Sequence, residues 1–223
     1  MNSRVCVVVA KYNEDVSWTK ALPCDVLIYD KSGKPGPLSL PNIGRESHTY
    51  LHHIVSTYPN FPDAVVFVQA DPFFHMDEPT PEAFYARVEQ NMRLGVAFTG
   101  FANYKLKCDR FGQPHNMHGS DAGKWAGAGR DIPVGALYER LFAGNVPDQF
   151  LVSAPAGLLY VRRDRILARP KALYQCALET VIADPDDAAN TGHAFERLWP
   201  IIFNGKTTLN KPQYDACSGA LHA

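Results

Sequence analysis

Three short apolar runs rich in β-branched residues stand out in the first third of the chain. Residues 5–10 (VCVVVA), 25–29 (DVLIY) and 64–68 (AVVFV) each have the length and side chains of a buried strand. A turn with a glycine and two prolines follows the second run, and residues 43–57 predict a helix before the third. Strands that alternate with helices indicate an α/β domain with a mainly parallel sheet.

The rest of the chain predicts further helices and one long loop-rich region. Residues 81–94 predict a surface helix, and residues 100–135 are rich in glycine and polar residues, which is typical of functional loops. An apolar segment at residues 151–162 ends in basic residues. Helices are also predicted at residues 166–182, with a break at Pro170, and at residues 193–203. No linker divides the chain, so we expect one domain over residues 1–203 and a C-terminal tail over residues 204–223.

Composition narrows the class of protein. The 223 residues carry a net charge of −1, which favours neither a nucleic-acid partner nor a membrane surface. The N-terminal apolar run is too short for a signal peptide, and no stretch approaches the roughly 18 apolar residues of a membrane span. The five cysteines show no CxxC spacing, so reduced thiols and a cytoplasmic location are expected.

Polar residues follow each predicted strand directly. Residues 11–15 (KYNED) follow the first, Asp30 and Lys31 the second, and residues 69–71 (QAD) the third. In a parallel sheet these segments meet at the edge formed by the carboxyl ends of the strands, where ligands bind. Lys31 is therefore a candidate substrate-binding residue, together with the segments on either side.

The segment VVFVQADPFFH places an acid at the end of a buried strand. Asp71 is positioned there to hold a divalent cation beside phosphates, with Gln69 as a neighbouring contact and His75 as a second ligand. The structural alternative is that Asp71 and Pro72 simply start a turn, as Asp-Pro sequences often do.

The segment PNIGRESHTYLHHI concentrates reactive side chains on one predicted helix. The turn at Gly44 leaves backbone N–H groups for an anion, and Arg45 adds a forked donor. His48 and His52 share a helix face and are candidate substrate-binding residues, but without an HExxH pattern they give a zinc site little support. In the alternative interpretation, Glu46 pairs with Arg45 or caps the helix, and the histidines are buried and hydrogen-bonded.

Two more segments supply candidates. Asn13, Glu14 and Asp15 could hydrogen-bond a nucleotide. In the alternative interpretation, Asn13 caps the helical turn that follows, and Glu14 and Asp15 are favourably placed near its N-terminus. In TGHAFERLW, His193 and Glu196 could act as a general base or metal ligand, or form a surface pair. The sequence has no GxSxG, Walker A or GxGxxG motif.

The combination VVVAKYNEDVSW, LIYDKSG, LPNIGRESHTYLHHI and VVFVQADPFFH resembles the DUF3431 family of uncharacterised proteins. These motifs extend to residue 75, and the later blocks APAGLLYVRRDRILARPKALY and GHAFERLWPIIF continue the resemblance more loosely. The family name carries no activity.

The chain is also similar, more weakly, to nucleotide-sugar glycosyltransferases of the GT-A type. This resemblance implies a Rossmann-like (GT-A-like) sheet, a first strand that runs into a nucleotide-binding turn, and a later strand that ends in a metal-binding DxD motif. Residues 5–15 would be the first element, Gln69-Ala70-Asp71 the DxD equivalent, and His193 or Glu196 the late ligand or base.

The sequence departs from the glycosyltransferase pattern where Gln69 replaces the first acid of DxD. This departure allows a metal-independent transferase, a ligand set that recruits His75, or a lost activity. From the glycosyltransferase resemblance we expect transfer of a sugar from a nucleotide-sugar donor to an unknown acceptor, with Mn²⁺ or Mg²⁺ as the cofactor if a metal is used. The alternatives are a metal-dependent hydrolase that uses His48, His52, Asp71 and His75, and a non-catalytic nucleotide-sugar-binding protein.

Overall fold

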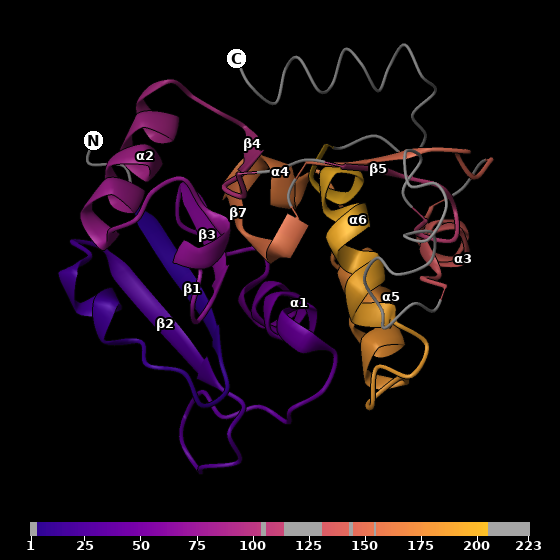
Figure 1. The fold of residues 1–223 in the computed structure, drawn as a ribbon, viewed down its shortest axis with the longest axis horizontal. Coiled ribbons are helices and arrows are strands. Elements are labelled where there is room, and N and C mark those ends of the chain that lie inside the picture. Colours follow the sequence, from indigo (N-terminus) through magenta and orange to yellow (C-terminus); the bar gives the residue numbers. More distant parts are fainter. Residues whose placement is uncertain (1–3, 104–105, 114–130, 143–144, 154, 205–223) are drawn as a thin grey trace.

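A five-stranded mixed sheet forms the centre of the protein (Figure 1). The computed structural model describes residues 4–103, 106–113, 131–142, 145–153 and 155–204. Strand order across the sheet is β2-β1-β3-β7-β4. The strands are β1 (Val5–Lys11), β2 (Asp25–Asp30), β3 (Ala64–Gln69), β4 (Phe98–Gly100) and β7 (Leu159–Arg162).

The first three strands form the parallel part of the sheet, as their apolar runs predicted. β1 pairs in parallel with β2 on one side and with β3 on the other. β7 then runs antiparallel to both β3 and β4. The predicted α/β class with a mostly parallel sheet is thus confirmed in its coarse form, with one reversed strand. A separate two-stranded sheet pairs β5 (Leu106–Cys108) with β6 (Phe150–Val152).

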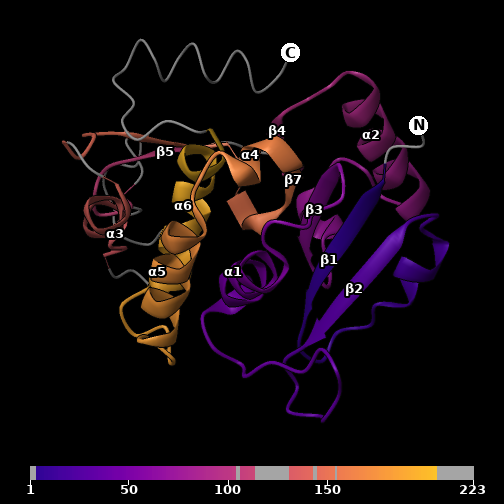
Figure 2. The ribbon, with the colours of Figure 1, turned by 180° about the vertical axis from the view of Figure 1, so that it is seen from behind.

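Helices cover both faces of the sheet (Figures 1 and 2). The short helix η1 (Ser17–Ala21) and α2 (Pro81–Arg93) lie on one face, and α1 (Arg45–Thr57) lies on the other. Side chains alternate along β1: Val7 and Val9 pack towards Phe84 of α2, whereas Val8 belongs to the larger core that includes Leu51 of α1. Both faces of the sheet are therefore buried, which accounts for the nearly continuous apolar strands.

α1 is enclosed on two sides. The sheet covers one side, and α5 (Lys171–Ile182) and α6 (Thr191–Asn204) pack against the other (Figure 1). The first two turns of α1 are accordingly buried beyond their apolar positions, and Ser47, His48 and Thr49 are all inaccessible or nearly so. The polar face that the sequence offered as a site is therefore largely an interior face.

The later helices follow the predicted pattern closely. Pro170 separates α4 (Arg163–Leu167) from α5, because proline fixes its own backbone and leaves no N–H for a continuing helix. α3 (Val134–Leu141) begins at the end of the predicted loop region, of which residues 114–130 lie outside the described residues. The predicted tail also lies outside them, from residue 205 onwards. Among the described helices, none has the length and apolarity needed to cross a membrane.

Candidate functional site

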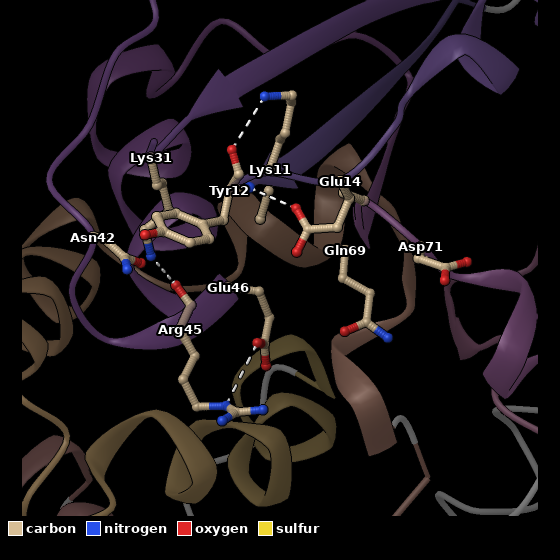
Figure 3. A pocket seen from close by; sticks show the side chains of 11 residues that line it. Lys11, Tyr12, Glu14, Lys31, Asn42, Arg45, Glu46, Gln69 and Asp71 are labelled. Atoms are coloured by element: carbon tan, nitrogen blue, oxygen red, sulfur yellow. Dashed lines mark hydrogen bonds and ion pairs between the residues drawn. The ribbon is translucent and has the colours of Figure 1, made fainter. Parts of the chain in front are cut away.

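A polar cavity of about 260 Å³ opens at the carboxyl ends of β1 and β3 (Figure 3). Parallel pairing sets Ala10 beside Gln69 and Lys11 beside Asp30, so the segments that leave the three strands emerge side by side. The cavity is lined by Ala10, Lys11, Tyr12, Glu14, Lys31, Asn42, Arg45, Glu46, Gln69, Ala70 and Asp71. The polar segments that follow β1, β2 and β3 meet at this edge of the sheet, as predicted.

The segment after β1 forms one wall. Lys11 Nζ donates hydrogen bonds to Asp30 Oδ2 at 2.9 Å and to the Tyr12 carbonyl at 3.1 Å. The Tyr12 N–H donates to Glu14 Oε2 at 2.7 Å, which fixes the turn that carries both side chains. The Tyr12 ring remains 45% exposed at the mouth of the cavity. Lys11 is thus neutralised within the protein, and Tyr12 offers an aromatic face to a ligand.

Lys31 holds the turn that leads into α1. Its side chain is only 4% exposed, and its ammonium donates to the backbone carbonyls of Ile43, at 2.6 Å, and of Arg45. Burial lowers the pKa of Lys31 to about 8. Gly44 and Arg45 both have left-handed backbone torsions, with φ of 56° and 52°. A non-glycine residue in this region is strained, and such strain persists only where the surroundings impose it. The Lys31 clamp therefore sets the direction in which Arg45 points.

Arg45 and Glu46 form the wall nearest to α6. The Arg45 side chain is 46% exposed, and its Nε atom lies 3.8 Å from Glu46 Oε2. Figure 3 shows the guanidinium beside the Glu46 carboxylate, below Gln69. Within the described part of the chain, the Arg45 guanidinium makes no hydrogen bond. It is the cation of the cavity that is most available to an anionic ligand.

The end of β3 forms the opposite wall. Trp18 Nε1 donates to the Ala70 carbonyl at 2.8 Å, which ties η1 to this strand end. The Asp71 carboxylate is exposed, and Gln69 is half-buried. The described residues give neither side chain a hydrogen-bond partner, so both are available to a ligand.

The cavity lining supplies carboxylates that could hold Mg²⁺ or Mn²⁺ together with a phosphorylated ligand. No group of three or more His, Cys, Asp or Glu side chains among the described residues could hold a metal ion. Mg²⁺, however, is commonly bound by one or two carboxylates plus substrate phosphates, and does not need an all-protein cage. Asp71 and Glu14 line the cavity and could supply such carboxylates. A cation there would neutralise phosphate charge.

Several predicted site residues lie outside this lining. Asn13 is exposed beside it. The Asp15 carboxylate accepts hydrogen bonds from the Ser17 N–H, at 2.9 Å, and from Ser17 Oγ, at 2.6 Å. These bonds lower the pKa of Asp15 and fix the turn before η1. The N-cap residue of η1 is Val16, without a side-chain cap hydrogen bond, so the alternative of a cap by Asn13 is wrong. His75 belongs to the short helix η2 (Phe73–His75) that follows the Asp71 turn, and it does not line the cavity.

The predicted residues of the α1 segment divide between cavity and core. Arg45 faces the cavity, whereas Gly44 packs against α5, where an added Cβ would lie 1.9 Å from Val181 Cγ1. His48 is buried, and its ring centroid lies 6.2 Å from that of His52. Burial lowers the pKa of His48 to about 4, and burial also lowers that of His52. His48 is therefore a neutral interior group at neutral pH, whereas His52 is only half-buried.

His193 and Glu196 lie behind the cavity wall, on α6. His193 Nδ1 is 3.3 Å from Asp187 Oδ2, and Glu196 Oε2 is 3.1 Å from Arg197 Nη1. Neither side chain lines the cavity. Both are close enough to Glu46 to change its pKa, Glu196 by raising it and His193 by lowering it. The structure thus connects them to the cavity through Glu46.

Four cavity residues with polar side chains were not among the predicted site residues: Lys11, Tyr12, Asn42 and Glu46. Lys11 and Tyr12 belong to the polar segment that directly follows β1, so their position in the sequence already indicated a place at the ligand-binding edge of the sheet. Asn42 lies in the turn before α1, where no pattern separates a ligand contact from an ordinary turn residue. Glu46 resembled a surface partner of Arg45, and only the packing of α6 over α1 reveals that it is buried.

Comparison with known proteins gives one match. Residues 6–220 match the family described as "Protein of unknown function (DUF3431)". The match includes all the elements that form the cavity and extends through α6. No curated protein and no solved structure matches the chain. Because the matched region spans nearly the whole sequence, the chain belongs to the DUF3431 family.

Proposed function

We propose that the protein is a glycosyltransferase-like enzyme that binds a nucleotide sugar in the cavity at the ends of β1 and β3. The observation that carries this proposal is a group of polar side chains without hydrogen-bond partners among the described residues, Arg45, Gln69 and Asp71, around a cavity at the carboxyl edge of parallel strands. The glycosyltransferase resemblance assigned the nucleotide to the first strand end and the diphosphate to a later one. Both ends meet in this cavity.

Arg45 is the proposed contact for the diphosphate. A guanidinium presents forked donors that match phosphate oxygens, and such charge-assisted hydrogen bonds are stronger than neutral ones. The carbonyl clamp from Lys31 holds the Arg45 backbone in place before the ligand arrives. A prearranged cation stabilises the charge that develops on the leaving diphosphate during transfer.

The segment after β1 is proposed to bind the nucleoside. The exposed Tyr12 ring can stack on a base, and the Glu14 carboxylate lies on the same wall. Base-aromatic stacking contributes about 1–3 kcal/mol in single-stranded nucleic-acid sites. Of the three residues predicted to contact the nucleotide, Glu14 lines the cavity, and we propose Tyr12 in place of Asn13 and Asp15. Asp71 would hold Mg²⁺ or Mn²⁺ beside the phosphates, with Gln69 as a polar neighbour. The described cysteines are all free thiols, which supports our proposal of a cytoplasmic location.

A thermal-shift panel tests this function. Nucleoside diphosphates and nucleotide sugars, at millimolar concentration with and without Mn²⁺, are expected to raise the melting temperature of the wild type. Arg45→Met should lose most of the shift, whereas Arg93→Met on α2, away from the cavity, should keep it. Asp71→Asn should lose only the part of the shift in melting temperature that Mn²⁺ adds. No stabilisation by any nucleotide would refute the proposal.

The alternatives give different results in the same experiments. A metal-dependent hydrolase would contain stoichiometric zinc or iron after purification and would ignore nucleotides. A non-catalytic binding protein would show the nucleotide-dependent shift but no release of nucleoside diphosphate from the bound sugar donor.

A further inference from the structure

Glu46 is a buried carboxyl group on the inner wall of a polar cavity. Its residue is only 7% exposed, yet it is among the residues that line the cavity. Its Oε1 atom is buried, and the described residues provide no hydrogen-bond partner for it. Buried polar atoms in native proteins are nearly always hydrogen-bonded, so a carboxyl group with an unpaired oxygen, on a residue that lines a cavity, points to a functional role.

On the side away from the cavity, the main chain packs closely against Glu46. Gly157, in the short helix η5 (Pro155–Gly157), packs so tightly that an added Cβ would lie 2.8 Å from Glu46 Cγ and 3.1 Å from Oε1. Tyr50, one turn along α1 from Glu46, donates from its hydroxyl to the Gly157 carbonyl at 2.9 Å. These contacts hold the carboxyl group against one face and leave the cavity as its open side.

Four charged or titratable groups act on this carboxyl group. Arg45 beside it and Lys31 from the preceding loop favour the ionised form, as does His193 of α6. Burial opposes ionisation most strongly, and Glu196 of α6 adds repulsion. The outcome is a Glu46 pKa of about 7, raised from 4.5. Tyr50 lies close enough for the Glu46 charge to raise its own pKa further, so it remains a neutral hydrogen-bond donor.

We propose that Glu46 is the general base of this site and removes the proton from an acceptor hydroxyl group. The proposal rests on the proposed function and assigns the base to Glu46 in place of Glu196 or His193. These two residues act through Glu46 as positioning residues. They set its charge and location from the layer behind the cavity wall.

The step balances as a single displacement. The acceptor oxygen attacks the anomeric carbon while its proton moves to the Glu46 carboxylate. The bond between the anomeric carbon and the diphosphate oxygen breaks, and its electron pair leaves with the nucleoside diphosphate. Arg45 neutralises the leaving group, and Glu46 then returns the proton to solvent through the open cavity. A base whose pKa lies near the working pH is well matched to such a transfer.

The first test is a direct titration of Glu46 in the full chain, without ligand. Carboxyl ¹³C resonances of glutamate-labelled protein are followed by NMR, and Glu46→Gln identifies the Glu46 signal. We expect a midpoint near neutral pH, a lower midpoint in Glu196→Gln, and no change in Glu89→Gln, an exposed site on α2. A Glu46 midpoint in the ordinary glutamate range would overturn the proposal.

The second test measures release of nucleoside diphosphate from nucleotide-sugar donors, with water or a panel of hydroxyl acceptors. Glu46→Gln should lower kcat by at least 100-fold while KM changes only a few-fold, because the amide keeps the shape but cannot accept the proton. Glu46→Asp should retain part of kcat. Glu196→Gln should move the acidic limb of the pH profile to lower pH. Full turnover in folded Glu46→Gln would overturn the proposal.

The two tests separate this inference from the proposed function. If no nucleotide sugar binds the wild type, the transferase function fails, and a near-neutral titration still identifies Glu46 as the proton-exchanging group of the cavity. If nucleotide sugars bind and turn over but Glu46→Gln is fully active, the function stands and Glu46 is not its base.

Discussion

Replacing Gly44 with alanine tests how the start of α1 is held against α5. Gly44 has φ of +56°, and a Cβ there would lie 1.9 Å from Val181 Cγ1. The left-handed backbone costs an alanine about 1–2 kcal/mol. Forcing a methyl group into a packed interior typically costs about 1–3 kcal/mol more. We therefore expect Gly44→Ala to lower the free energy of unfolding by about 2–5 kcal/mol.

Two further variants separate the backbone and packing contributions. Gly33 also has a positive φ, of +82°, but nothing lies within 4 Å of an added Cβ. Gly33→Ala should therefore cost only about 1–2 kcal/mol. Val181→Ala removes the clashing methyl group, so Gly44→Ala should cost about 1–3 kcal/mol less in that background.

Equilibrium unfolding in urea, followed by circular dichroism, measures all four variants, including the double variant. The reasoning is refuted if Gly44→Ala costs no more than Gly33→Ala, and if its cost is the same with valine or alanine at position 181. That result would mean that α1 and α5 do not pack as described, and that Gly44 serves the backbone turn alone.

Three more changes have defined outcomes. Burial and Glu196 raise the pKa of Glu46 to about 7, so the folded protein holds this proton more tightly than the unfolded chain does. The stability that Glu46 contributes is therefore full below about pH 4.5 and is lost as the pH rises through 7. In guanidinium unfolding, Glu46→Gln should gain about 3 kcal/mol in the free energy of unfolding relative to wild type between pH 4.5 and 8. Burial lowers the pKa of His48 to about 4, so the stability that it contributes is full above about pH 6.5 and falls as the pH drops through 4. Between pH 7 and pH 4, the free energy of unfolding of His48→Gln should fall by about 3 kcal/mol less than that of the wild type. An equal fall in both proteins would contradict this. Trp18→Phe leaves the Ala70 carbonyl without its 2.8 Å hydrogen bond and should cost about 1–3 kcal/mol in urea unfolding; an unchanged midpoint would mean that η1 is not tied to β3.

The parallel core of the fold was predictable because its signals are local. β1, β2 and β3 are short apolar runs followed at once by polar segments, and parallel pairing brings those segments together. Lys31, Gln69 and Asp71 therefore reach the cavity as expected. Pro170 marked a helix boundary for an equally local reason, since a proline cannot continue a helix.

Non-local packing determined what the sequence could not show. β7 is antiparallel to β3, its neighbour in the sheet, which lies nearly a hundred positions away in the chain. α5 and α6 cover the far side of α1, so His48 became an interior residue although its residue type suggested a ligand. Glu46 pairs with Arg45 as the alternative predicted, but the same covering also buries its carboxyl group and raises its pKa. A single sequence contains no periodic signal for a helix enclosed on two sides.

The most direct test of the central claim is isothermal titration calorimetry with the nucleotide or nucleotide sugar that stabilises the protein most. The account predicts saturable binding to the wild type and to Arg93→Met. It predicts affinity weaker by about 10–100-fold in Arg45→Met, which is the loss expected for a charge-assisted hydrogen bond. Equal affinity in all three proteins, or no binding to any of them, would contradict a diphosphate site at Arg45.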